Sequence, residues 1–141
     1  MAELCWSNGT IAPLLRTMLK PITEAQMAVY RATAQRLAQE RVQQLRSKHQ
    51  RAWEVARQAA QILKQQFGAQ QVAIFGSMLS RDRVHERSDL DIAVWGLDQD
   101  LYYQAVSRLL DLDPSLPIDL VEVERAKPKI RAAIEHESVV L

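Results

Sequence analysis

The sequence predicts an α/β domain of the α+β kind, with a small mixed β-sheet, helices on one face and a long N-terminal helical extension. Residues 24–66 contain neither Gly nor Pro and consist mostly of strong helix formers. Three short apolar runs at 72–75, 89–94 and 118–123 have the composition and alternation of strands. Helical stretches and turn residues separate these runs, so we expect strands and helices to alternate in the second half of the chain.

The chain begins with a segment that predicts little regular structure. Residues 1–22 contain Gly9, Pro13 and Pro21, so we expect irregular backbone with at most one short helical turn at 14–19. Thr23 then has the character of a helix N-cap, because Gln26 follows three residues later in a capping-box pattern. Gly68 marks the end of the helix that begins there.

The two halves of the long helix are expected to have different roles. At the usual rise the helix would measure about 66 Å, which is longer than a small domain can cover. An apolar seam with heptad-like steps runs along it and weakens between residues 46 and 51. We therefore expect residues 1–51 to form an arm for oligomerisation or partner binding, and residues 52–141 to form the domain. The alternative is that the arm folds back on its own domain.

The second half supplies the remaining elements. A helix is expected after Asp98, and Pro114 and Pro117 break the chain before the strand at 118–123. A further helix is expected over residues 128–136. The apolar residues 139–141 predict a short edge strand at the end.

The stretch from residue 72 to residue 94 carries the clearest chemical signal. Asp89 and Asp91 are two residues apart in an expected strand, so both carboxylates project from the same face. Two like charges at that distance repel, and Mg²⁺ with its preference for carboxylate oxygens would neutralise them. Gly76 and Ser77 form a turn after the preceding strand, and free backbone N–H groups with the serine hydroxyl would bind phosphate oxygens there.

A third carboxylate is expected from the run IDLVEV. Asp119 is preferred to Glu122, which lies on the opposite face by parity. Three carboxylates, two metal ions and a phosphate-binding turn suit in-line phosphoryl or nucleotidyl transfer. The intervening loop adds cations that could contact a triphosphate, although a solvated loop explains any one of them equally well. These cations are Arg81, Arg83 and Arg87.

These residues together resemble a known signature. Gly76-Ser77, an eleven-residue spacer, Asp89-Leu90-Asp91 and the later Asp119 are similar to the motif of polymerase-β-type nucleotidyltransferases. More narrowly, they resemble the minimal nucleotidyltransferases (MNT) that are paired with HEPN toxins in prokaryotes. The resemblance covers about residues 52–141. The spacer is one residue longer than is usual in the family, and Asp82 stands where a glycine often follows the arginine.

The resemblance implies a function. MNT proteins act as antitoxins that transfer AMP from ATP to a tyrosine hydroxyl of a cognate HEPN ribonuclease. It implies that Asp89, Asp91 and Asp119 hold two Mg²⁺ ions, and that Gly76 and Ser77 bind the β- and γ-phosphates. Two alternatives stay open: an antitoxin that neutralises its toxin by binding alone, and a nucleotidyltransferase that modifies small molecules such as antibiotics.

Bulk properties limit the setting. Residues 1–66 carry ten Lys and Arg against four Asp and Glu, whereas residues 67–141 carry eight against thirteen. This asymmetry favours self-association or a charged protein partner, and no direct nucleic-acid binding is expected. No stretch has the length and hydropathy of a membrane span, and a single cysteine favours a cytoplasmic location.

Overall fold

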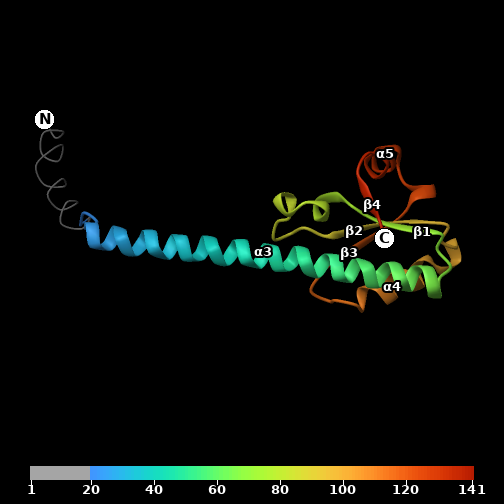
Figure 1. Ribbon diagram of the computed structural model, residues 1–141, viewed down its shortest axis with the longest axis horizontal. Coiled ribbons are helices and arrows are strands. Elements are labelled where there is room, and N and C mark those ends of the chain that lie inside the picture. Colours follow the sequence, from blue (N-terminus) through green and yellow to red (C-terminus); the bar gives the residue numbers. More distant parts are fainter. Residues whose placement is uncertain (1–19) are drawn as a thin grey trace, which may run out of the picture. The chain divides into compact units, whose positions relative to one another are not determined.

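The structure is a computed structural model that describes residues 20–141, so the predicted irregular segment lies almost wholly outside the described residues. Its helices are α3 (Glu24–Gln66), α4 (Tyr102–Leu110) and α5 (Pro128–His136). Its strands are β1 (Gln71–Phe75), β2 (Leu90–Trp95), β3 (Ile118–Glu122) and β4 (Ser138–Val140). Short 3₁₀ turns connect them (Figure 1): η1 (Gly76–Leu79), η2 (Arg81–Arg83), η3 (Gln99–Leu101) and η4 (Val123–Arg125).

Helix α3 begins and ends as its sequence predicts. The Thr23 backbone N–H donates to Gln26 Oε1 at 3.0 Å, and the Gln26 backbone N–H donates to Thr23 Oγ1 at 3.1 Å. This reciprocal pair is the predicted capping box. At the other end Gly68 has a φ of +69°, and the following residue donates back to the Leu63 carbonyl at 3.0 Å. The capping signals therefore suffice to set both ends of a 43-residue helix.

The four strands form one mixed sheet in the order β3-β2-β1-β4. β1 is antiparallel to both β2 and β4, and β2 is parallel to β3. Helix α4 lies in the crossover that a parallel pair requires. β4 lies at an edge of the sheet, as the apolar end of the sequence predicts.

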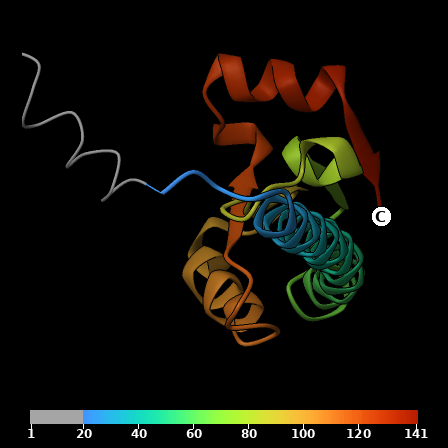
Figure 2. The same cartoon turned by 90° about the vertical axis from the view of Figure 1, so that its left-hand side faces the viewer.

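The sheet has two unlike faces. One face packs its fully buried Ile74, Leu90 and Ile92 in the same core as residues of α3 and α4. On the other face, Phe75 and Ala93 pack in a smaller cluster with Ile134 of α5. Figure 2 shows α5 on the side of the sheet opposite to α3 and α4. The mixed-sheet fold class is confirmed, and the expected placement of helices on one face is corrected for α5, because its apolar residue meets the face of the sheet that the other two helices leave open.

Contacts divide the chain into two compact units, residues 1–40 and residues 41–141. Within the second unit, residues of α3 ahead of position 52 contact the rest of the domain. Arg41 pairs with Glu86 at 3.0 Å, and Leu45 packs against the main core. In the first unit the apolar residues Val29, Tyr30 and Leu37 are all exposed. Among the described helices, none combines the length and the apolar character that crossing a bilayer demands.

Candidate active site

The predicted aspartates lie together at one end of β2 and β3. Asp91 and Asp119 are direct partners in the parallel register, so their side chains project from the same face of the sheet. Asp89 lies one residue before β2 begins. Burial, and then the negative charges of Asp119 and Asp89, together raise the pKa of Asp91 from 3.8 to about 6. The structure thus brings the three carboxylates close enough to interact.

Gly76 belongs to the same site. Its φ is +80°, a left-handed backbone conformation that side-chain-bearing residues rarely adopt. A Cβ at this position would overlap Asp91 Oδ2 and lie 3.2 Å from Asp91 Cγ. The turn therefore needs glycine for two reasons, and the second ties the predicted phosphate turn directly to the predicted metal ligand.

The turn itself is shorter than a helix. Residues Gly76–Leu79 form a single 3₁₀ turn whose preceding residue is extended and makes no side-chain cap. Ser77 is half-buried. The groups that this turn offers to a phosphate are its backbone N–H groups and the Ser77 hydroxyl.

The carboxylates could bind Mg²⁺ as part of its ligand set. In residues 20–141 no three His, Cys, Asp or Glu side chains are arranged so that they alone could hold a metal ion. Two facing carboxylates still suit Mg²⁺, which is commonly bound through one or two carboxylates and the phosphates of the substrate. The raised pKa of Asp91 fits this role, since a cation between the carboxylates would relieve the repulsion that raises it.

Side chains of α3 form hydrogen bonds with the turn that contains Gly76 and with the loop that leads to Asp89. Trp53 Nε1 donates to the carbonyl of Met78, in the phosphate turn, at 2.9 Å. Lys48 Nζ donates to the carbonyls of His85 and Glu86, in the loop that leads to Asp89, at 3.3 and 2.8 Å. One helix therefore holds both of these segments by hydrogen bonds.

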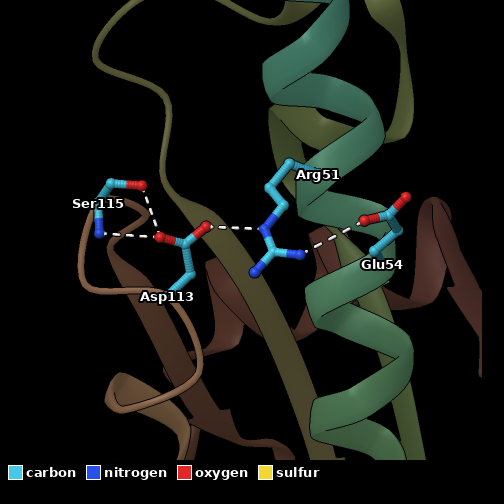
Figure 3. A network of polar contacts seen from close by, with 4 residues as sticks. All are labelled: Arg51, Glu54, Asp113 and Ser115. Carbon is cyan, nitrogen blue, oxygen red and sulfur yellow. Dashed lines mark hydrogen bonds and ion pairs between the residues drawn. The ribbon is translucent and has the colours of Figure 1, made fainter.

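The loop that leads to β3 is fastened to the same helix. Arg51 Nε donates to Asp113 Oδ2 at 3.0 Å, and Arg51 Nη1 lies 3.4 Å from Glu54 Oε2 (Figure 3). Asp113 Oδ1 accepts from the backbone N–H and the hydroxyl of Ser115 at 3.0 and 2.5 Å. Ser115 and then Arg51 lower the pKa of Asp113 by these hydrogen bonds. This network restrains the backbone of the loop that leads to β3 and Asp119.

Comparison with known proteins identifies the family. The model of the family described as polymerase beta, nucleotidyltransferase, matches residues 57–141. The chain belongs to this nucleotidyltransferase family. No curated protein sequence matches the chain.

Solved structures of similar fold carry related names. A chain of the MntA–HepT toxin–antitoxin complex is 18% identical, with a TM-score of 0.47, and the match covers 62% of this chain and 69% of that one. A chain from a complex of tri-AMPylated Shewanella oneidensis HEPN toxin with MNT antitoxin is 19% identical, with a TM-score of 0.40 and coverage of 68% and 70%. A minimal nucleotidyltransferase is 22% identical, with a TM-score of 0.42 and coverage of 71% and 95%.

The three predicted arginines of this nucleotidyltransferase differ in their surroundings. Arg83 forms a bidentate ion pair with Glu137, with Nη1–Oε2 and Nη2–Oε1 distances of 3.1 and 2.6 Å. Its guanidinium would have to leave that pair to reach a phosphate. Arg81 lines a hollow beside α3, and Arg87 is exposed in the loop before Asp89. Their role toward phosphate stays a prediction.

Tyr102, near Asp119, and Trp53, beside the turn at Gly76, were not singled out as site residues by the sequence pattern. The Tyr102 hydroxyl donates to the carbonyl of Leu120 at 2.9 Å, and burial, followed by the charges of Asp119 and Glu122, raises its pKa. Trp53 was expected only to pack in the core, and its hydrogen bond to the phosphate turn had no sequence signal. Glu122 lies on the face of the sheet opposite to Asp119, and its Oε2 is 3.4 Å from Arg125 Nε.

Proposed function

We propose that this nucleotidyltransferase transfers AMP from ATP to a hydroxyl group of a protein, with divalent metal ions held by Asp89, Asp91 and Asp119. The observation that carries the proposal is the direct register of Asp91 and Asp119 beside Gly76. Carboxylates next to a turn that can accept phosphate are what in-line nucleotidyl transfer requires. Mg²⁺, when bound, would neutralise charge on the phosphates and on the attacking and leaving oxygens.

The residues of the chain divide the work. Gly76 and Ser77 bind the β- and γ-phosphates and so align the α-phosphate with the carboxylates. Asp119, at the exposed edge of the site, accepts the proton of the attacking hydroxyl or orients that hydroxyl through a hydrogen bond. The bond between the α- and β-phosphates breaks, AMP joins the acceptor oxygen and pyrophosphate leaves. Arg81 and Arg87 are the cations available to stabilise the departing pyrophosphate.

We further propose that the acceptor is a tyrosine of a cognate HEPN ribonuclease toxin, so that the chain acts as its antitoxin. The motif from Gly76 to Asp119 supports this substrate, because its composition and spacing resemble those of MNT antitoxins. The exposed apolar residues Val29, Tyr30 and Leu37 support the arm as the surface that binds this partner or a second copy.

Intact mass spectrometry of the partner tests the proposal. The purified chain would be incubated with ATP, Mg²⁺ and the HEPN protein encoded beside it, and then the same reaction would be run with the Asp89→Ala/Asp91→Ala double variant. We expect mass increments of AMP on the HEPN protein with the unmodified chain only. An unmodified HEPN protein that is nevertheless neutralised in a stable complex would contradict catalysis and indicate inhibition by binding.

A further inference from the structure

The hollow that Arg81 lines lies beside α3, which packs on the face of the sheet opposite to the aspartates. Its volume is about 520 Å³. One stripe of α3 side chains forms its floor, and a residue of η2 closes one side. The residues that line it are Arg46, His49, Gln50, Trp53, Glu54, Arg57 and Arg81.

The hollow collects positive charge that the described residues do not neutralise. Arg46, Arg57 and Arg81 are exposed, and none forms an ion pair within residues 20–141. The one acidic residue in the lining, Glu54, is engaged by Arg51 at 3.4 Å. The three guanidinium groups give the hollow a net positive charge, which favours a multiply charged anion.

The other polar groups of the hollow are also suited to an anion. Trp53 Nε1 donates to His49 Nε2 at 3.1 Å in addition to its bond with Met78. Because His49 Nε2 accepts this bond, Nδ1 is the ring nitrogen that is left to donate a hydrogen bond. The guanidinium of Arg57 lies 5.8 Å from the centre of the Trp53 ring, a cation–π distance that restrains it over the hollow. The donors are thus partly ordered before any ligand binds.

We propose that this hollow is a second anion site that binds a polyphosphate, either free or as the phosphate chain of a nucleotide. Planar guanidinium forks match phosphate oxygens, and a compound with several negative charges can engage three arginines at once, which a single carboxylate cannot. Its α3 residues belong to a helix that packs on the face of the sheet opposite to the aspartates, and Trp53 joins the hollow to the carbonyl of Met78. Arg81 is the one residue that the catalytic proposal also uses.

Calorimetric titration of the full-length Asp89→Ala/Asp91→Ala variant in EDTA tests this site without any contribution from metal-dependent nucleotide binding. The probes are sodium tripolyphosphate and ATP. We expect both to bind, and Arg46→Gln with Arg57→Gln to weaken binding by about tenfold for each arginine removed. Arg31→Gln with Arg36→Gln is the matched control, since it removes the same charge from the same helix outside the hollow, and it should change the affinity less than about twofold.

The outcomes separate cleanly. Equal affinity for tripolyphosphate and ATP identifies the phosphate chain as the ligand, and tighter binding of ATP identifies a nucleotide; either supports the site. If both pairs of substitutions weakened binding of the probes equally, net charge alone would explain the effect, and the proposed site would be overturned. Absence of tripolyphosphate binding would overturn the proposal, and binding of a glutamate-rich peptide, titrated as a third probe, would then indicate an acidic protein partner. None of these results depends on whether the chain transfers AMP.

Discussion

The two faces of the sheet differ on the same strands, because one packs in the main core and the other combines the aspartates with a smaller apolar cluster. In β2, Leu90, Ile92 and Val94 point to one face and are fully buried. Asp91 and Ala93 alternate with them and point to the other face. Burying a side chain such as Ile92 stabilises the fold by about 1.5 to 3 kcal/mol, whereas half-burying the carboxylate of Asp91 raises its pKa and opposes folding when the group is charged.

The alternation of buried apolar residues and Asp91 along β2 shows how a short strand can contribute both to stability and to a binding site. The side chains that hold β2 in place and the side chains that bind a ligand are separated by one residue, and the strand period assigns them to different layers. Helix α3 connects the layers, because it packs on the apolar face and also reaches around to the loops through Lys48, Arg51 and Trp53. Substitutions on the two faces should therefore have separable effects.

The largest expected effect is on the rate of transfer. Asp119→Asn removes a carboxylate from the aspartate face, and we expect the rate of AMP transfer to fall by about a thousandfold, because metal-assisted charge stabilisation contributes several kcal/mol. Glu122→Gln, on the same strand but the opposite face, should leave the rate within about threefold. The rates would be measured from the increase in the mass of the partner over time. Equal losses of rate in both variants would contradict the separation of the two faces of the sheet.

The largest expected effect on stability comes from the apolar face. Ile92→Ala should lower the free energy of unfolding by about 2 to 5 kcal/mol, since it leaves a cavity in the main core. Asp91→Asn, its neighbour in sequence, should leave stability unchanged or raise it at pH 7 by removing the repelled charge. Urea denaturation of both variants measures the contrast. A loss of stability in Asp91→Asn as large as in Ile92→Ala would show that the aspartate is structural.

Gly76→Ala tests the contact between the turn and the site. The φ of +80° costs an alanine about 1 to 2 kcal/mol, and the new Cβ would displace the Asp91 carboxylate. Gly68→Ala is the control, because its φ is +69° and a Cβ there meets nothing within 4 Å. We expect both variants to lose similar stability in urea and Gly76→Ala alone to lose affinity for Mg²⁺ and ATP. Unchanged affinity of Gly76→Ala for Mg²⁺ and ATP would show that the turn does not belong to the binding site.

A smaller effect concerns pH. The folded chain binds the Asp91 proton more tightly than the unfolded chain does, because the pKa is raised from 3.8 to about 6. In EDTA, this group should therefore lower the free energy of unfolding as pH rises from about 4 to about 6, with no further change above that range. Asp91→Asn should lack this part of the pH dependence. Urea unfolding at intervals across the range measures it, and identical profiles for both proteins would contradict the raised pKa.

Local sequence patterns predicted the parts of the fold that have local causes. The capping box at Thr23, the stop at Gly68 and the strand alternation around Asp91 each depend on a few neighbouring residues, and each is found. These are short-range rules, so the sequence alone was enough for them. The direct register of Asp91 with Asp119 also needed β2 and β3 to be parallel neighbours in the sheet.

Other features depend on contacts between distant segments. The bidentate pair of Arg83 with Glu137 joins residues that are 54 positions apart, so no local pattern could show that this guanidinium is engaged. The bond from Trp53 to the phosphate turn and the packing of Ile134 on the aspartate face have the same origin. An apolar residue in a short helix predicts burial, and only the assembled sheet decides which face it covers.

The most direct test of the aspartate face is the Mg²⁺ dependence of ATP binding, measured by calorimetry with and without the ion. To remove any anion site beside α3, both proteins would carry Arg46→Gln and Arg57→Gln. We predict that Mg²⁺ raises the affinity for ATP by at least about tenfold when Asp91 is present and has no effect when it is replaced by Asn. An equal increase in both proteins, or no increase in either, would contradict the assignment of metal binding to this face.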